Sequence, residues 1–412
     1  MKLVLFEDTK VSQLYPMTLA RPAFAVSCGS YRLVDLVGRL ELDAYAIVRE
    51  YLQAIVDADF GLSEPEDDGR TNHLLFVNAR AVPSVDTLRV LTQLKDNRLP
   101  KAVRGDGEIA AALVDIRQTP LPDSLTPDSV AGWLESLELE SCVERIELSA
   151  YPHEVLKNHL RITAANLEDR LAQGGYSEVR DGVFVRENVT LGEHLVADTA
   201  EGPILIDQGA SIGPFCFLQG PVYVGPGSKV IEHAALKEAV ALGHTTKVGG
   251  EVEGSTIEPY TNKQHHGFLG HSYLGSWVNL GAGTCNSDLK NTYGTVSVEY
   301  RGKRVATGMQ FVGCVIGDYS KTAINTSIFT GKIIGVCSMV YGFVTTNVPS
   351  FTNYARTFGQ MSEIPVEVVL AGQQRMFKRR KVEQRPCDIA LIQAMHALTA
   401  SERQLSDEPL SF

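Results

Sequence analysis

An aliphatic residue recurs at every sixth position over a long central stretch of the chain. The consecutive positions are Ile206, Ile212, Leu218, Val224, Val230, Leu236, Leu242 and Val248. A period of six matches neither the 3.6-residue repeat of an α-helix nor the two-residue repeat of a single strand. It is typical of a parallel β-helix, in which each short strand points one aliphatic side chain into a shared interior. Glycine often follows the aliphatic residue, as at Gly213 and Gly225, where the chain must turn a tight corner.

Two breaks in this repeat predict two insertions into the β-helix. The aliphatic series stops after Val248, resumes out of phase at Phe268, and returns from Ile316 onward. We therefore predict excursions at about 250–267 and 284–310; both contain Asn and Lys, and the first also contains His265 and His266. Loops that leave a rigid scaffold often carry binding and catalytic groups.

The composition indicates a cytoplasmic protein with more than one domain. With 412 residues, the chain exceeds the usual size of a single hydrophobic core. The net charge of −11 argues against a nucleic-acid partner, which requires a basic surface. No apolar run approaches the roughly 20 residues needed to cross a bilayer, so no membrane partner is expected. The seven cysteines include no C-x-x-C pair and are expected to be reduced thiols.

The predicted organisation is two domains and a tail. Residues 1–170 alternate short apolar strands with helical patterns, which predicts an α/β domain with a mostly parallel sheet. A linker at 171–182 leads to the β-helix at 183–348, and a helical tail occupies 349–412.

The tail carries a basic cluster within a stretch of helical pattern at 366–398. Its members are Arg375, Lys378, Arg379, Arg380, Lys381 and Arg385. Such a charge run is usually a solvated helix face. The alternative is that the cluster meets the phosphates of a bound cofactor.

The stretch at 262–291, NKQHHGFLGHSYLGSWVNLGAGTCNSDLKN, carries the most specific motifs. It resembles the acetyltransferase half of the bifunctional UDP-N-acetylglucosamine diphosphorylase/glucosamine-1-phosphate N-acetyltransferases, whose pattern is H-x-x-Y-x-G followed by N-x-G-A-G. His265 takes the histidine position, Gly270 the glycine, and residues 279–283 the N-x-G-A-G run. The blocks NKxHxGxLG and NLGAGTxNSDLKNxYG are similar to the divergent bacterial form of this family.

The resemblance implies a left-handed, trimeric β-helix that uses acetyl-CoA, with His265 as the general base. A free imidazole titrates near neutrality and can accept a proton from an attacking amine. Acyl transfer also needs donors for the oxyanion, and the backbone N–H groups of Gly281, Ala282 and Gly283 can approach the thioester closely. We therefore assign these three residues to acetyl-CoA.

The acceptor, an amino-sugar phosphate, is expected to contact a set of polar, basic and aromatic residues around these motifs. The predicted contacts are Asn262, Lys263, Phe268, Asn279, Asn286 and Lys290. Phe268 stands where the family has tyrosine, so it can stack on a sugar but cannot donate a hydrogen bond. The upstream phosphate-binding cations of the family have no clear match, and Lys237 and Lys247 are candidates by charge alone.

Alternatives remain open for these residues. His265 could be a hydrogen-bonded structural histidine, and Asn279 could belong to an asparagine ladder inside the β-helix. His233, His266 and His271 resemble the three zinc ligands of γ-class carbonic anhydrases, which would make the protein a zinc-dependent hydratase.

The opening segment VLFEDTKVSQLYPMTLARP resembles the start of the sugar nucleotidyltransferase half of the divergent family, a Rossmann-like domain. The resemblance implies that Arg21 and Thr18 contact nucleotide phosphates, although Arg21 could equally form an ordinary ion pair. Asn78 stands near the place where related enzymes hold Mg²⁺ with an aspartate, and we also assign it to the nucleotide. Since a neutral amide is a poor magnesium ligand, Asp8 is the candidate metal ligand.

The combined prediction is a homotrimeric transferase. It would acetylate glucosamine 1-phosphate with acetyl-CoA and transfer a nucleotidyl group from UTP to the sugar 1-phosphate with Mg²⁺, making UDP-N-acetylglucosamine. Two alternatives are nucleotidyl transfer from dTTP to glucose 1-phosphate and a noncatalytic N-terminal module.

Overall fold

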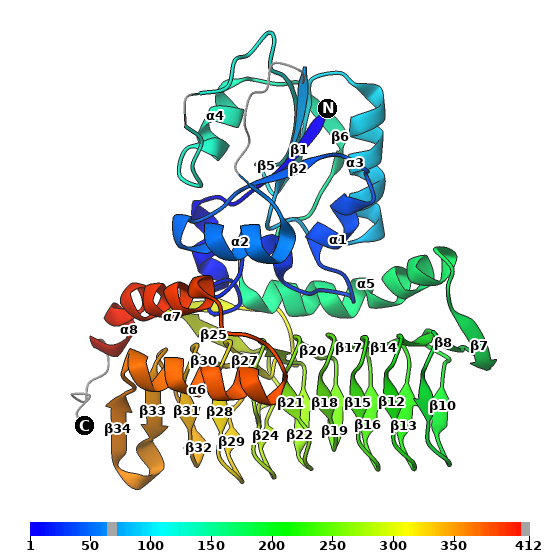
Figure 1. The fold of residues 1–412 in the computed structure, drawn as a ribbon, viewed down its shortest axis with the longest axis vertical. Coiled ribbons are helices and arrows are strands. Elements are labelled where there is room, and N and C mark those ends of the chain that lie inside the picture. The colour runs from blue at the N-terminus through cyan, green and yellow to red at the C-terminus, as the bar shows by residue number, and fades with distance from the viewer. Residues whose placement is uncertain (64–71, 123, 405–412) are drawn as a thin grey trace. The chain divides into compact units, whose positions relative to one another are not determined.

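The computed structural model describes residues 1–63, 72–122 and 124–404. The chain divides into two compact units (Figure 1). The first unit comprises Met1–Val26, Tyr31–Tyr151 and Pro386–Leu391, and the second comprises Ser27–Ser30, Pro152–Arg385 and Ile392–Phe412. The long helix α5 (Pro152–Ala172) therefore groups with the second unit. The sequence analysis instead predicted that the first domain extends to residue 170.

The first unit is built around a six-stranded sheet in the order β2-β1-β3-β5-β4-β6. The strands are β1 (Lys2–Phe6), β2 (Ala44–Ile47), β3 (His73–Asn78), β4 (Lys101–Gly105), β5 (Glu108–Asp115) and β6 (Ser141–Arg145). The α-helices are α1 (Leu33–Gly38), α2 (Gln53–Phe60), α3 (Val85–Asn97) and α4 (Val130–Ser136), with 3-10 turns η1 (Thr9–Leu14), η2 (Ala23–Ala25) and η3 (Glu50–Leu52).

The sheet is mixed, because β5 runs antiparallel to both of its neighbours while β1 pairs in parallel with β2 and β3. The tight connection through Asp106 and Gly107, both at positive φ, turns β4 back as a hairpin. All five residues of β1 are buried, as expected for a strand covered on both faces.

The second unit contains a parallel β-helix of the left-handed type, with three walls. The first wall consists of β7 (Ser177–Arg180), β8 (Val183–Val185), β11 (Ile204–Ile206), β14 (Val222–Val224), β17 (Val240–Leu242), β20 (Thr256–Ile257), β23 (Tyr273–Leu274), β27 (Cys314–Ile316) and β30 (Lys332–Ile334). The second wall consists of β9 (Thr190–Leu191), β12 (Ser211–Ile212), β15 (Lys229–Val230), β18 (Lys247–Val248), β21 (Asn262–Lys263), β28 (Lys321–Thr322), β31 (Met339–Val340), β33 (Thr352–Ala355) and β34 (Gln360–Glu363). The third wall consists of β10 (Val196–Asp198), β13 (Phe217–Gln219), β16 (Ala235–Lys237), β19 (Glu251–Glu253), β22 (Phe268–Gly270), β24 (Cys285–Asn286), β29 (Ser327–Ile328) and β32 (Phe343–Val344).

The six-residue aliphatic repeat forms the core of this β-helix, as predicted. Every member from Ile206 to Val248 is buried in one hydrophobic cluster. The predicted excursion at 250–267 is wrong, because this segment forms β19, β20 and β21 and adds Val252 and Ile257 to the same cluster. The phase shift has another cause.

Shortened corners produce that phase shift. Fifteen residues separate the register partners Ala241 and Thr256, against eighteen for Val222 and Val240 in the preceding coil. In the later coil the third-wall core position belongs to Leu269 and not to Phe268, which is half-buried.

The second predicted excursion is present. The chain leaves the β-helix after β24, forms an antiparallel hairpin of β25 (Ser297–Tyr300) and β26 (Lys303–Ala306), and returns at β27. The β-helix also continues past residue 348, since β33 and β34 extend the second wall. The expected helical stretch at 366–398 is two helices, α6 (Val366–Arg379) and α7 (Pro386–Leu398), and α8 (Ala400–Gln404) follows. Within the described ranges, no helix combines the length and apolar character required to cross a bilayer.

Candidate functional site

His265 lies on the corner between β21 and β22, and this corner is longer than the one before it. In the preceding coil, residues 249–250 join the second and third walls, whereas residues 264–267 do so here. The residues His265 and His266 therefore have no counterpart in the preceding coil, and both side chains are exposed. Among the described residues none forms a hydrogen bond with the His265 ring, so the alternative of a hydrogen-bonded structural histidine does not describe it.

Lys263 supports this corner from inside the β-helix. It is the register partner of Val248, at an inward position, and is only 2% exposed. Its Nζ donates to the carbonyl oxygens of Gly249 at 2.8 Å and His265 at 2.7 Å. Burial lowers the pKa of the Lys263 ammonium to about 8. This arrangement does not support the predicted contact with an acceptor phosphate, because the ammonium is turned inward and already bonded.

The N-x-G-A-G run forms the same corner one coil later. The N–H of Gly283 donates to the carbonyl oxygen of His266 at 3.0 Å, and that of Gly281 donates to Thr322 Oγ1 at 3.0 Å. The N–H of Ala282 makes no hydrogen bond to the part of the chain that the structure describes. Of the three predicted oxyanion donors, Ala282 is therefore the one that stays available.

Asn325 completes this corner in the following coil, and sequence reasoning did not single it out. Its N–H donates to the carbonyl oxygen of Ala282 at 2.7 Å. A Cβ on Gly283, which has φ +73°, would lie 2.1 Å from Asn325 Oδ1, so only glycine fits there. Asn325 itself adopts φ +55°, a conformation that asparagine tolerates well. An asparagine at a corner position of the repeat is the signal that could have found it.

Asn262 and Asn279 lie side by side on the outer surface of the second wall. Asn262 Nδ2 donates to Asn279 Oδ1 at 3.3 Å, and Arg380 Nη2 donates to Asn262 Oδ1 at 2.6 Å. Asn279 is exposed, so the alternative of an asparagine ladder inside the β-helix is wrong for it. Acceptor binding by these two amides remains a prediction.

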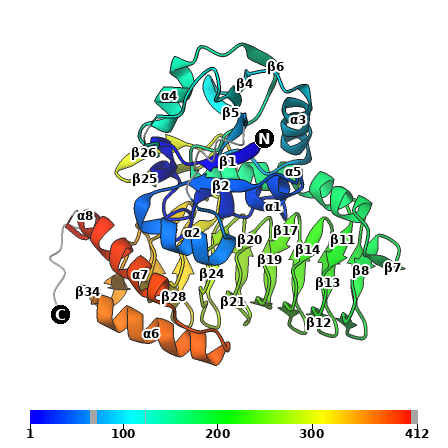
Figure 2. The ribbon, with the colours of Figure 1, turned by 45° about the horizontal axis from the view of Figure 1, so that its top comes forward.

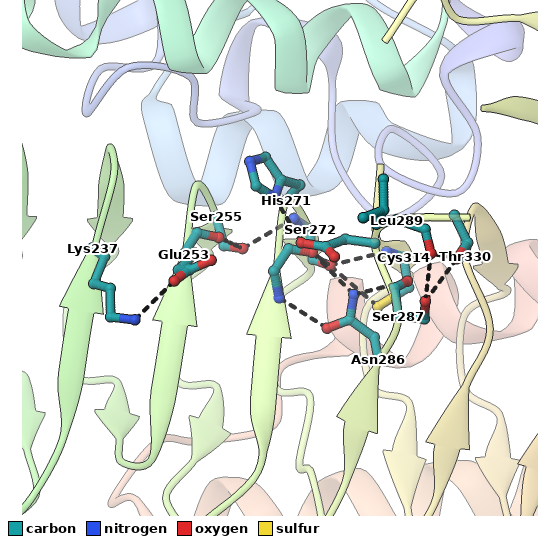
Figure 3. A network of polar contacts seen from close by, with 12 residues as sticks. Lys237, Glu253, Ser255, His271, Ser272, Asn286, Ser287, Leu289, Cys314 and Thr330 are labelled. Carbon is teal, nitrogen blue, oxygen red and sulfur yellow. Dashed lines mark hydrogen bonds and ion pairs between the residues drawn. The ribbon is translucent and has the colours of Figure 1, made fainter. Parts of the chain in front are cut away.

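Asn286 is the asparagine that points inward. It is 5% exposed, and its amide pairs with both backbone groups of Gly270, accepting from N at 2.9 Å and donating to O at 3.0 Å. Figure 3 shows this amide within the polar network of the coils. The predicted contact with the acceptor is therefore not supported, since the amide replaces a strand hydrogen bond.

Of the remaining predicted acceptor contacts, Phe268 follows the corner that carries His265, whereas Lys290 lies on the later excursion. Phe268 opens β22, directly after the corner, and its ring packs against Gly270 and stays half-exposed. Stacking on an acceptor sugar remains a prediction for it. Lys290 lies on the excursion, where its Nζ donates to the carbonyl oxygen of Thr295 at 3.1 Å. That hydrogen bond joins two residues of the excursion.

The third wall beside this corner is acidic, and its lysine is neutralised. Lys237 forms ion pairs with Glu251 and Glu253, the latter at 2.9 Å (Figure 3). Because both carboxylates face this ammonium, Lys237 is a poor candidate for binding an acceptor phosphate.

The three histidines of the hydratase alternative are not brought together. His233 stacks on Phe215 at the surface, with ring centroids 5.3 Å apart. His271 is buried, and its Nδ1 lies 2.8 Å from Asp288 Oδ2. Among the described residues, no group of three or more His, Cys, Asp or Glu side chains is arranged to hold a metal ion.

In the first unit, Asp8 is enclosed by protein donors. Its carboxylate accepts from Lys10 N at 3.0 Å, from Asn78 Nδ2 at 2.8 Å and from Arg80 Nη2 at 2.7 Å. Burial raises the pKa of Asp8, but the hydrogen bonds and charge of Arg80 outweigh it and lower the pKa overall. These residues do not fit Mg²⁺, because a guanidinium already holds the carboxylate. The predicted metal role of Asp8 is therefore not supported.

Two of the residues predicted to contact the nucleotide are buried, and their side chains bond to other groups of the protein. Asn78 is 1% exposed and bonds Asp8 and the backbone N of Arg80. Thr18 is fully buried, and its hydroxyl donates to the carbonyl oxygen of Val11. Arg21 is half-buried, and its role stays a prediction.

Sequence reasoning missed Arg49, which organises this opening segment. Its Nη2 donates to the carbonyl oxygens of Thr18 at 2.7 Å and Arg21 at 3.1 Å. Its Nε pairs with buried Glu7 at 2.9 Å. An arginine beyond the motif offers no local signal for this role.

The fold is that of an α/β unit joined to a β-helix of the hexapeptide-repeat type. Residues 3–168 match the family model described as sugar nucleotidyl transferase. The bifunctional sugar-1-phosphate nucleotidylyltransferase/acetyltransferase of Sulfurisphaera tokodaii is 32% identical over 209 residues, covering 50% of this chain and 48% of that protein. The bifunctional protein GlmU of Ralstonia pickettii is 34% identical over 118 residues, covering 28% of this chain and 25% of that protein.

The chain thus spans about half the length, or less, of these relatives. Among solved structures, the UDP-N-acetylglucosamine acyltransferase of Francisella novicida aligns with 55% of this chain and 82% of that chain, at 15% identity and a TM-score of 0.26. Residues 3–168 thus resemble sugar nucleotidyl transferases, and the chain is similar to bifunctional GlmU proteins over part of its length.

Proposed function

We propose that the protein is a transferase whose β-helix acetylates the amino group of a sugar phosphate, with glucosamine 1-phosphate as the first candidate and acetyl-CoA as the donor. The observation that carries this proposal is the exposed imidazole of His265 on a lengthened corner, with the N-x-G-A-G run directly above it in the next coil.

In this reaction the amine nitrogen attacks the thioester carbonyl carbon, the C–S bond breaks, and the thiolate of coenzyme A leaves. The His265 ring takes the proton that the nitrogen loses as the amide forms. The Ala282 N–H, which bonds no described group, is the donor we assign to the developing oxyanion. Asn262 and Asn279 provide amides for the hydroxyl groups of the acceptor.

The matched first region is proposed to transfer a nucleotidyl group to a sugar 1-phosphate, with UTP and N-acetylglucosamine 1-phosphate as first candidates and dTTP with glucose 1-phosphate as the alternative. The family match at residues 3–168 and the name of the Sulfurisphaera tokodaii relative support this part. Enzymes of this kind use Mg²⁺, and the ligands in this chain would have to be other than Asp8.

A second candidate for the first unit is a noncatalytic binding module. The enclosure of Asp8 by Arg80 and Asn78 favours it, because a metal-dependent nucleotidyl transfer needs an available carboxylate. Pyrophosphate release from UTP and the sugar 1-phosphate, followed with and without Mg²⁺, chooses between the two. Turnover supports the transferase, and its absence in a folded protein supports the module.

We also propose a cytoplasmic homotrimer, in keeping with these substrates. Exposed apolar side chains on the later coils, among them Ile324, Phe329 and Phe343, are the kind of surface that association covers. Light scattering on the purified protein measures the subunit number directly, and a monomer would contradict the proposal.

The acetyltransferase assignment is tested with His265→Ala and its neighbour His266→Ala. Loss of a general base should lower the rate of acetyl transfer by about 10²- to 10⁴-fold in His265→Ala, with an unchanged melting temperature because the ring is exposed. His266→Ala is the matched control and should keep most of the activity. Normal acetyl transfer by His265→Ala would reject the assignment.

A further inference from the structure

Basic side chains gather on the outer face of the second wall. Lys229 and Lys247 are register partners in the adjacent parallel strands β15 and β18. Because Val230 and Val248 point into the core, the two lysines point outward, about 4.8 Å apart along the backbone ladder. Asn262 is the next partner in this row and accepts the hydrogen bond from Arg380.

Helix α6 brings two arginines to these lysines. Its buried residues Val369, Gln373 and Phe377 recur every fourth position on one face. The Phe377 ring packs on Trp277, with centroids 4.5 Å apart, and this contact fixes the end of the helix beside β21. Figures 1 and 2 show α6 lying along the coils of the second unit. Arg379 is the last residue of α6 and Arg380 is its C-cap, two and three residues after Phe377, so apolar packing determines where their charges lie.

We call Lys229, Lys247, Arg379 and Arg380 the second-wall cation cluster. Within the described ranges, none of its members forms an ion pair with a carboxylate. Burial lowers the pKa of the Lys247 ammonium, and the charges of Arg380, Lys229 and Arg379 lower it further.

Lys237 on the third wall differs from these four cations, because it forms ion pairs with two glutamates. In a chain of net charge −11, four neighbouring cations that pair with no described carboxylate make a locally positive surface, which attracts a ligand with negative charge.

We propose that the second-wall cation cluster binds the phosphate groups of an anionic substrate. Phosphate suits the site because lysine and arginine provide charged donors to its oxygens. The row from Lys247 continues through Asn262, whose strand β21 leads straight into the corner that carries His265. A phosphate held here would thus lie on the wall next to that corner. Two sources share this chemistry, namely the phosphates of coenzyme A and the phosphate of the acceptor sugar. Assigning the source rests on the proposed acetyltransferase function, whereas phosphate binding itself does not.

Calorimetric titration of the full chain with inorganic pyrophosphate tests the proposal. The double variant Lys229→Gln/Lys247→Gln should bind pyrophosphate at least about tenfold more weakly, since each lost charge removes a charge-assisted hydrogen bond. Lys303→Gln, an exposed lysine on the β26 hairpin, is the matched control and should bind like the wild type. Without ligand, the double variant should melt no lower than the wild type, because repulsion is relieved.

Competition then identifies the source. Displacement of pyrophosphate by coenzyme A assigns the site to the acyl donor, and displacement by glucosamine 1-phosphate assigns it to the acceptor. His265→Ala should bind pyrophosphate normally, so failure of the acetyltransferase assignment and failure of this site give different results. Equal pyrophosphate affinities in the double variant and the wild type, with both folded, would overturn the proposal.

Discussion

The ammonium of Lys263 donates a hydrogen bond to the carbonyl oxygen of His265, at 2.7 Å, from inside the β-helix. Lys263 occupies an inward position that Val248 fills in the preceding coil. The same ammonium also binds the carbonyl oxygen of Gly249, so it joins the lengthened corner to the shorter one before it. This arrangement holds the backbone of His265 and leaves its ring exposed.

The buried Lys263 predicts a specific pH dependence of stability. Its folded pKa of about 8 lies below its ordinary value of 10.5, so between these values the unfolded chain binds more protons at this residue. The free energy of unfolding should therefore rise with pH from about 8 to 10.5, and the full cost of burying the charge applies below pH 8. Relative to Lys263→Met, the rise should be on the order of 3 kcal/mol. Urea unfolding at several pH values measures it, and parallel curves for the two proteins would contradict it.

Gly283 should not tolerate a side chain. In Gly283→Ala the new Cβ would lie 2.1 Å from Asn325 Oδ1, and φ +73° adds backbone strain, so we expect a loss of roughly 2–4 kcal/mol and weaker acetyl transfer. Gly302→Ala is the matched control, since Gly302 has φ +79° but open space around it. Adding Asn325→Gly to Gly283→Ala should restore part of the stability. Equal losses in the two glycine variants would mean that the contact with Asn325 is unimportant, and thermal unfolding decides this.

The buried pair of Asp8 and Arg80 should matter far more than an exposed pair of the same kind. Arg80→Met leaves a buried carboxylate without its cation, which should cost about 3–5 kcal/mol. Arg89→Met breaks the exposed pair with Asp86 and should cost less than about 0.5 kcal/mol. Denaturant unfolding compares the two. If the loss in Arg80→Met arises from the unpaired charge, Asp8→Asn in the same chain should recover part of it, and no recovery would point to lost packing.

The architecture of the second unit was predictable because its signal is local and repeated. Any residue facing a closed interior must be apolar, whatever the rest of the chain does, so the series from Ile206 to Val248 indicates a β-helix by itself. The motif singled out His265, but the predicted excursion that was to carry it is a lengthened corner between β21 and β22. The break after Val248 was misread, because a shortened coil and an inserted loop shift the phase in the same way.

The polar residues of the site were harder to predict. Asn279 and Asn286 belong to one motif, yet the first is exposed on the second wall and the second is buried against Gly270. A one-residue change in register reverses which side chains point inward, and the motif alone does not specify that register. Lys263 shows the same limit, since a lysine is not expected at an inward position unless nearby carbonyl oxygens can receive its ammonium.

The sequence by itself therefore determined the repeat, the two-part organisation and the segment that carries the proposed base, since each depends on the order of residues along the chain. Only the tertiary structure decided which charges are already neutralised. Asp8 pairs with Arg80 across a long stretch of sequence, and Lys237 pairs with its glutamates in the neighbouring coil. The ammonium of Lys247, in contrast, is close enough to the charge of Arg380 to be repelled by it. Electrostatic interactions depend on distance in space, and that distance is set by how the coils and helices pack.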